Sequence, residues 1–200
     1  MTNRRALEPG PHSVAENAIP PFNALRAAIQ KAAAAGVNWI QIREKDIAAR
    51  ELAELVGNAI RDTAETGARI LVNERLDVAL AANAAGIHLG EQSLPLEAVA
   101  EWRRNSGQKE FLIGVSCHSV EAARAAERGG ADYIHFGPVF ATPSKAAFGP
   151  PQGIEKLREV CASVNIRVLA IGGVNFENAQ ECFSAGAAGI AAIRLFQGSK

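Results

Sequence analysis

The chain has 200 residues, of which 48% are hydrophobic, and its 21 Lys and Arg residues balance 21 Asp and Glu residues. This length suits one domain with a substantial core, so we expect residues 1–200 to form a single domain. A net charge of zero argues against nucleic acid or an anionic membrane as a partner. Three scattered cysteines, a polar start and the lack of a long apolar run predict a cytoplasmic protein without disulfides or membrane spans.

Short apolar runs alternate along the chain with longer segments of helical spacing. The first helix is expected at residues 20–35, and no strand is recognisable before it. Seven strands follow, and a glycine in the left-handed conformation is expected just before the first, third, fifth and seventh of them. This alternation predicts an α/β fold, a (βα)8 TIM barrel whose first strand is largely missing or truncated at the N-terminus. The expected strands are residues 37–42, 69–73, 86–89, 112–115, 132–136, 167–171 and 189–193.

Polar side chains share one face at the end of the first expected strand. The segment WIQIREK alternates apolar and polar residues, so its isoleucines should face the outer helices and Gln41, Arg43 and Lys45 the barrel mouth. Cationic groups that converge there would bind an anion with several oxygens. The alternative is a polar interior layer in which nearby acidic residues pair with the cations. Two inward cations are costly without a bound anion, which favours the anion site.

Two later loops carry groups that suit a phosphate. The segment GPVFATPSK, residues 137–145, offers the hydroxyls of Thr142 and Ser144 beside the cation of Lys145. Gly172 and Gly173 follow the strand at 167–171, where glycine would let a phosphate approach backbone N–H groups. The alternative is that these glycines only shape the turn. The two loops predict a phosphate-binding barrel and say nothing of the reaction.

The histidines differ in their expected roles. His88 and His135 fall within strands and are expected to be interior residues with satisfied hydrogen bonds, not catalysts. His118 follows the strand at 112–115, at the height of an active site, where it would serve as an acid or base or else cap the next helix. Cys117 beside it has no evident activating partner, so we do not expect a thiol nucleophile.

Five motifs resemble, in order and spacing, those of the thiamine phosphate synthase/TenI family. They are QIREK, LVNERLDVALAANAAGIHLG, IGVSCHSVEAARAAERGGADYIHFGPVFATPSK, LAIGGV and AGAAGIAAI. The resemblance runs from Val37 to the end of the chain, and TNR at residues 2–4 is similar to the TDR that closes the family's first strand. It implies a transferase that joins 4-amino-2-methyl-5-pyrimidinylmethyl diphosphate to a thiazole phosphate and releases diphosphate. Mg²⁺ is the implied cofactor, phosphorylated pyrimidine and thiazole are the implied partners, and homo-oligomer formation is left open.

The resemblance also assigns residues to the site. Glu74 stands where the family has its first magnesium aspartate, Ser93 where it has the second, and Arg194 where synthases usually have a serine. Glu74 is therefore the one expected metal ligand, although Asn73 and Glu74 would also suit the start of a helix. Catalytic roles are implied for Arg43, Lys45, Ser116, Lys145 and His118. Substrate binding is expected for Gln41, Arg43, Lys45, Asn73, Ser116, Thr142, Ser144, Lys145, Gly172, Gly173, Ile193 and Arg194.

These departures leave two alternatives to a synthase. TenI-like thiazole tautomerases resemble synthases, lack the aspartate pair and use a histidine after the fifth strand of the complete barrel. That strand is residues 112–115 here, and His118 follows it. The other alternative is a non-catalytic barrel that binds thiamine precursors or phosphate, because a missing first strand would expose two strand edges. The retained QIREK, Asn73 and TPSK favour diphosphate chemistry, and hence the synthase.

Overall fold

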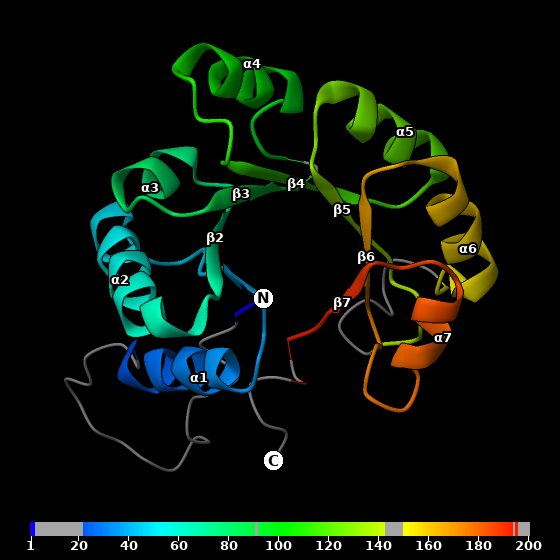
Figure 1. Cartoon of the computed structure of the whole chain (residues 1–200), viewed down its shortest axis with the longest axis horizontal. Coiled ribbons are helices and arrows are strands. Elements are labelled where there is room, and N and C mark those ends of the chain that lie inside the picture. The colour runs from blue at the N-terminus through cyan, green and yellow to red at the C-terminus, as the bar shows by residue number, and fades with distance from the viewer. Residues whose placement is uncertain (3–21, 91, 143–149, 194, 196–200) are drawn as a thin grey trace. The chain divides into compact units, whose positions relative to one another are not determined.

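The computed structural model describes residues 1–2, 22–90, 92–142, 150–193 and 195. Strands and helices alternate in these ranges, as Figure 1 shows, and all seven expected strands are present. The strands are β1 (Trp39–Ile42), β2 (Arg69–Asn73), β3 (Gly86–Leu89), β4 (Leu112–Cys117), β5 (Tyr133–Phe136), β6 (Arg167–Ile171) and β7 (Gly189–Ala191). The helices are α1 (Phe22–Ala34), α2 (Ala49–Asp62), α3 (Leu76–Ala81), α4 (Leu96–Ser106), α5 (Val120–Gly129), α6 (Gly153–Ser163) and α7 (Ala179–Ser184), with a 3₁₀ turn at Ala64–Thr66.

The chain divides into two compact units, residues 1–87 with 193–200 and residues 88–192. In the first unit β1 pairs in parallel with β2, and the N–H of Ala85 just before β3 donates to Ile70 O at 2.8 Å. In the second unit β4, β5, β6 and β7 pair in parallel in the order of the sequence. Parallel neighbours joined by helices are the arrangement expected of βα repeats. The predicted α/β fold class is therefore confirmed.

Thr2 lies against the edge of β1, although no strand is assigned to Met1 or Thr2. The Thr2 N–H donates to Gln41 O at 2.8 Å, and the Thr2 hydroxyl accepts from the Arg43 N–H at 3.0 Å. The same hydroxyl donates to Glu44 Oε1 at 2.8 Å, and Thr2 is only 3% exposed. Thr2 is the first residue of the segment TNR, which is similar to the end of the family's first strand. It is therefore hydrogen-bonded to β1.

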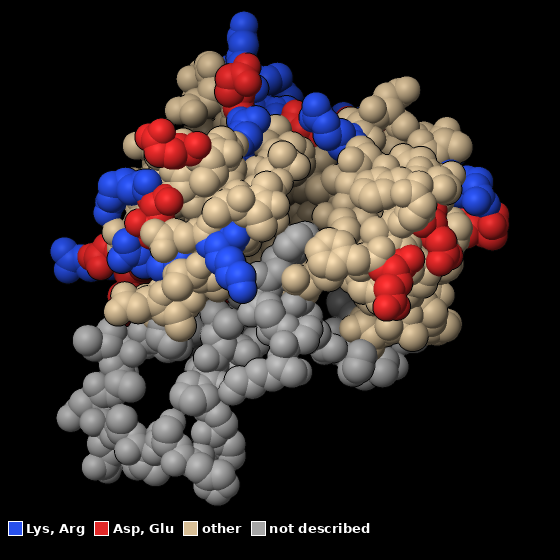
Figure 2. Space-filling view, turned by 60° about the horizontal axis from the view of Figure 1, so that its bottom comes forward, with Lys and Arg blue, Asp and Glu red and all other residues tan. Residues whose placement is uncertain are grey.

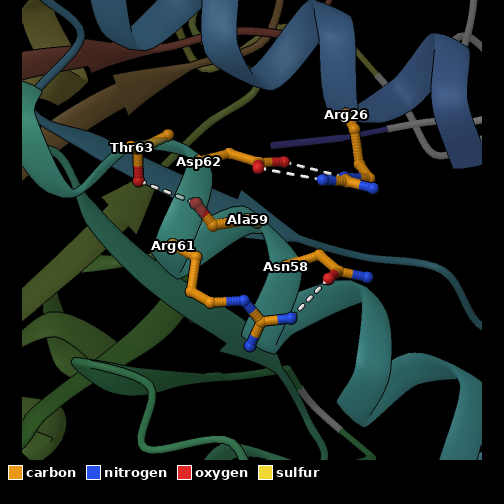
Figure 3. Close-up of polar contacts among 6 residues, drawn as sticks. All are labelled: Arg26, Asn58, Ala59, Arg61, Asp62 and Thr63. Carbon is orange, nitrogen blue, oxygen red and sulfur yellow. Dashed lines mark hydrogen bonds and ion pairs between the residues drawn. The ribbon is translucent and has the colours of Figure 1, made fainter.

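An apolar stripe and an ion pair help to pack the helices of the first unit. Four buried residues of α2 recur at helical spacing, Leu52, Leu55, Val56 and Ala59. Arg26 of α1 donates from Nε and Nη2 to the two carboxylate oxygens of Asp62, at 2.7 and 2.9 Å, as Figure 3 shows. This hydrogen-bonded pairing holds the pKa of Asp62 below its ordinary value.

Three of the four expected helix-to-strand glycines adopt the left-handed conformation. Gly36 has φ 88°, Gly130 φ 95° and Gly186 φ 100°. The prediction is wrong before β3, where Asn83 takes this conformation with φ 54° and Gly86 instead begins the strand. Asparagine tolerates left-handed φ because its short polar side chain can form local hydrogen bonds.

The core of the second unit lies between its strands and the helices along one face of them. Figure 1 shows α5, α6 and α7 on the outer side of β4 to β7. Ile134 and Phe136 of β5 are fully buried in this core, together with Leu157 of α6 and Cys182 of α7. Burial of these side chains supplies the main stabilisation of the layer.

Charged side chains of both signs lie side by side on the face drawn in Figure 2. On α6, Lys156 and Glu159 form an ion pair one helical turn apart, with Nζ 2.8 Å from Oε2. Within the described ranges, no helix has the length and apolar character that crossing a membrane requires.

Candidate functional site

In the first unit, Gln41 and Asn73 meet across β1 and β2. The Gln41 Nε2 amide donates to Asn73 Oδ1 at 2.7 Å, and Gln41 is 3% exposed. Gln41 Oε1 is buried and has no hydrogen-bond partner in the described part of the chain. A buried acceptor without a partner is costly, so a donor from a bound ligand would stabilise this position. Two of the expected site residues are thus brought together.

The two cations that follow β1 differ from Gln41 in exposure. Arg43 and Lys45 are exposed, whereas Ile40 and Ile42 of the same strand are buried. Lys45 Nζ lies 3.0 Å from Glu74 Oε2 and 3.2 Å from Oε1. The expected metal ligand Glu74 therefore forms an ion pair with an expected diphosphate ligand.

Glu74 also occupies a strained backbone position. Its φ is 63°, which an L-residue with a long side chain rarely adopts. The Arg75 N–H donates to Asn73 O at 2.8 Å and closes a three-residue turn around Glu74. Such strain is characteristic of positions where surrounding structure holds a side chain in place.

The helix-start role considered for Asn73 is wrong. The N-cap of α3 is Arg75, and no side chain caps that helix end. The Arg75 guanidinium instead donates to the carboxylate of Asp77, which lowers the pKa of Asp77. Asn73 is left to contact Gln41, because the turn at Glu74 separates it from the helix.

In the second unit, Ser116 contacts a histidine that the sequence did not single out for catalysis. Ser116 lies on β4, and its Oγ is 2.9 Å from Nε2 of His88 on β3. The other ring nitrogen, Nδ1, is 3.2 Å from the hydroxyl of Tyr133 on β5. His88 is therefore an interior residue with satisfied hydrogen bonds, as expected. Sequence reasoning missed its contact with Ser116, because the spacing along the chain does not reveal cross-strand neighbours.

His135 and Cys117 are buried groups with perturbed pKa values. His135 stacks on His88 with ring centroids 4.1 Å apart, and its Nδ1 has no partner among the described residues. The expectation that His135 is fully satisfied is therefore wrong for this atom. Burial keeps the pKa of His135 well below its ordinary value and raises the pKa of the Cys117 thiol to about 12. A neutral thiol is a poor nucleophile, as predicted for Cys117.

His118 follows β4 and is exposed. Its Nδ1 donates a hydrogen bond to the carbonyl oxygen of Gly137. This contact places the proton of the neutral ring on Nδ1, so that Nε2 carries the lone pair. The alternative role as a helix cap is wrong, because Ser119 is the N-cap of α5 and accepts from the Ala122 N–H at 3.1 Å.

Gly172 and Gly173 hold two loops of the second unit close together. Both have positive φ, 92° and 68°. A Cβ on Gly172 would lie 2.5 Å from Pro138 Cα, and one on Gly173 would lie 2.7 Å from Ala141 O. The Phe140 N–H donates to Gly172 O at 2.9 Å. The glycines therefore shape the loop that leads to Thr142, and a phosphate role for them stays a prediction.

Within the described part of the chain, no three His, Cys, Asp or Glu residues gather in a way that would hold a metal ion. Ser93, at the position of the family's second aspartate, accepts a hydrogen bond from the Gly90 N–H at 2.7 Å and so closes a turn. Glu74 is a carboxylate at the end of β2, and a single carboxylate fits Mg²⁺, which usually takes one or two together with substrate phosphates. Ile193 lies two residues beyond β7, and Ser144, Lys145 and Arg194 lie outside the described residues.

The chain is similar to known proteins over most of its length. The family described as thiamine monophosphate synthase matches residues 14–196. A protein of Geobacter sulfurreducens is 50% identical over 169 residues, 84% of this chain and 78% of that protein. A thiamine-phosphate synthase of Moorella thermoacetica is 44% identical over 172 residues, 86% and 80% of the two chains. The solved structure of thiamine phosphate pyrophosphorylase from Pyrococcus furiosus is 36% identical with a TM-score of 0.76, covering 96% of this chain and 82% of that one. The chain belongs to the thiamine monophosphate synthase family, as its motifs predicted.

Proposed function

We propose that this chain is a thiamine-phosphate synthase, a transferase of thiamine biosynthesis. It joins the pyrimidinylmethyl group of the pyrimidine diphosphate to the ring nitrogen of thiazole phosphate and releases diphosphate. The observation that carries the proposal is a set of polar contacts at the ends of β1 and β2, in which Gln41 pairs with Asn73 and Lys45 with Glu74. These contacts occur in a chain that is 44% identical to a thiamine-phosphate synthase.

The proposed reaction begins with departure of diphosphate, which leaves a pyrimidinylmethyl cation for the thiazole nitrogen to capture. Negative charge grows on the leaving oxygens, so fixed cations lower the barrier. Arg43 and Lys45 supply this charge beside β1, and Lys145 is proposed to add to it. The Oε1 acceptor of Gln41 suits the 4-amino group of the pyrimidine, because that amine supplies the missing donor.

We propose that Glu74 binds Mg²⁺ when the diphosphate is bound. When bound, Mg²⁺ would supply positive charge that stabilises the leaving diphosphate. Lys45 would then exchange its contact with Glu74 for a diphosphate oxygen, and the Glu74 carboxylate would turn to the ion. The exchange keeps each of these charges paired in both states, which limits the cost of desolvation.

The proposed cellular setting and domain organisation rest on simpler observations. Cys117, Cys161 and Cys182 are all free thiols, which supports a reducing, cytoplasmic location. The family match over residues 14–196 includes parts of both compact units and supports one functional domain.

The test of the proposed function is a synthase assay on the purified chain with pyrimidine diphosphate, thiazole phosphate and Mg²⁺. We expect the parent chain to form thiamine phosphate. Lys145→Ala should lower the rate of its formation at least about 100-fold, because one lost cationic contact to a leaving oxygen costs about 3 kcal/mol. Lys156→Ala, which removes a lysine paired with Glu159 on α6, is the matched control. No product from the parent chain would contradict the proposal.

A thiazole tautomerase is the second candidate, and the orientation of His118 favours it. The hydrogen bond from Nδ1 to the Gly137 carbonyl selects the tautomer whose lone pair is on Nε2, and this nitrogen is the one available as a proton-transfer base. Isomerisation of the thiazole carboxylate phosphate that is lost in His118→Gln, without synthase turnover, would support this activity over the transferase.

A further inference from the structure

Tyr133, His88 and Ser116 all belong to the second unit and form a line of hydrogen bonds across the neighbouring strands β5, β3 and β4. The Tyr133 hydroxyl is 3.2 Å from His88 Nδ1, and His88 Nε2 is 2.9 Å from Ser116 Oγ. Tyr133 and His88 are 0% and 1% exposed, whereas Ser116 is half-buried. The line therefore runs from the interior to the hydroxyl that the resemblance assigns to the diphosphate.

The packing around this line fixes its geometry. Gly114 on β4 is the register partner of Tyr133 on β5, and a Cβ on Gly114 would lie 2.0 Å from Tyr133 Cζ. The tyrosine ring therefore crosses β4 above a residue that has no side chain and reaches β3. The His135 ring stacks on His88 with a 29° angle between their planes. His88 is thus held through both ring nitrogens and one ring face.

The charge states of the line follow from its burial. Burial lowers the pKa of His88 to about 3 and raises the pKa of the Tyr133 hydroxyl. At neutral pH the histidine is therefore uncharged and the tyrosine keeps its proton. A neutral imidazole donates from one nitrogen and accepts at the other, so the hydrogen bonds run in one of two directions.

The two directions have different consequences for Ser116. If Tyr133 donates to His88 Nδ1, then Nε2–H donates to Ser116 Oγ, and the serine hydrogen is available for a ligand. If the direction is reversed, the serine hydrogen is used on His88 and only a ligand with a donor could bind Oγ. Diphosphate oxygens are acceptors, so only the first direction serves an anionic leaving group.

We propose that Tyr133 and His88 are positioning residues that orient Ser116 as a hydrogen-bond donor to the leaving diphosphate. This inference rests on the proposed synthase function for its ligand, but the direction of the hydrogen bonds belongs to the ligand-free protein. No proton moves along the line, because its role is to hold the serine hydroxyl in one orientation before diphosphate departs.

The direction is tested by ¹⁵N NMR of the imidazole nitrogens in the full chain at neutral pH, without and with inorganic diphosphate and Mg²⁺. We expect His88 to be the tautomer protonated on Nε2 in both conditions, and Tyr133→Phe to raise the population protonated on Nδ1. A parent protein protonated on Nδ1 would overturn the proposal. This result does not depend on turnover, so it stays distinct from a failed synthase assay.

A double-mutant cycle tests the route through Ser116. We expect His88→Met to lower kcat about 10-fold with little change in KM, and His88→Gln, whose amide N–H₂ can replace Nε2–H, to recover most of that loss. When Ser116→Ala is already present, neither His88→Met nor Tyr133→Phe should lower kcat further. Equal losses with and without Ser116→Ala would mean that His88 acts through packing alone and would overturn the proposal. Tyr133→Phe removes one oxygen atom and keeps the cycle usable if His88→Met does not fold.

Discussion

At the scale of single residues, Glu74 combines a functional position with an unfavourable backbone. Its carboxylate contacts Lys45 through both oxygens, and its φ is 63°. An aspartate or glutamate at this position could have been expected to start α3, but α3 begins after it, at Leu76. The local turn thus directs the side chain toward β1 instead of the helix.

The proposed metal role of Glu74 predicts a change in magnesium dependence. Glu74→Gln should raise the Mg²⁺ concentration that gives half-maximal synthase activity about 10-fold, because loss of one charged contact costs about 1.5 kcal/mol. The measurement is the rate of thiamine phosphate formation against Mg²⁺ concentration. Asp77→Asn removes an exposed carboxylate nearby in the sequence and is the control. An unchanged Mg²⁺ dependence in Glu74→Gln would show that Glu74 is not a ligand.

The backbone of Glu74 predicts a change in stability that is independent of the metal. Glu74→Gly and Glu74→Ala both remove the ion pair with Lys45, but only glycine adopts φ 63° without a steric cost. Glu74→Gly should therefore be more stable than Glu74→Ala by about 1 kcal/mol. Urea unfolding of the two variants measures this difference, and equal free energies of unfolding would contradict the assigned strain.

At the scale of elements, Arg103 joins α4 to the strands that follow it. Its Nη1 donates to Phe111 O at 3.1 Å and to the Asp132 carboxylate, and its Nη2 donates to Gly130 O at 2.9 Å. Asp132 Oδ2 also accepts from the Ile113 N–H at 2.7 Å. One guanidinium thus connects a helix, the start of β4 and the turn before β5.

Removal of this guanidinium should destabilise the second unit. Arg103→Met keeps most of the aliphatic stem and should lower the free energy of unfolding by about 1–3 kcal/mol, because the carbonyl and carboxylate groups lose a charged donor. Arg104→Met, at an exposed position on the same helix, should change it by less than about 0.5 kcal/mol. The comparison is made by urea unfolding, and similar losses in the two variants would refute the structural role of Arg103.

The elements themselves were largely predictable from the sequence, since their signals are local. Apolar runs such as RILVN and GIHL predicted β2 and β3 with the bounds that the structure has. The left-handed residue before β3 was assigned wrongly, because asparagine and glycine both satisfy that conformation and Gly86 lay nearer the strand. Pattern alone cannot decide which of two nearby residues that tolerate the left-handed conformation adopts it.

At the scale of the whole molecule, two buried neutral histidines make stability depend on pH. His88 has a pKa near 3 and His135 one well below its ordinary value, because burial disfavours the charged ring. In the unfolded chain both titrate near their ordinary pKa of about 6.5. The unfolded state therefore binds more protons below pH 6.5, and stability falls as the pH drops through that value toward 3.

We expect the free energy of unfolding to fall by about 1–4 kcal/mol as the pH is lowered from 7 to 5. This range lies above the ordinary pKa values of carboxylates, so their protonation adds little to the change. Urea unfolding at several pH values measures the slope. The variant His88→Gln with His135→Phe should unfold with a much smaller slope between the same limits, whatever its absolute stability. A parent protein with the same stability at pH 7 and pH 5 would contradict the burial of neutral rings.

The sequence by itself determined the order of strands and helices, the family and the residue types of the site, because hydrophobic periodicity and short motifs act locally along the chain. It could not determine which side chains meet across strands. Only the tertiary structure decided that Glu74 pairs with Lys45, that Gln41 leaves one acceptor without a partner in the described part of the chain, and that His88 contacts Ser116. The contacts of Glu74, Gln41 and His88 join residues 28 to 32 positions apart, so they depend on strand register.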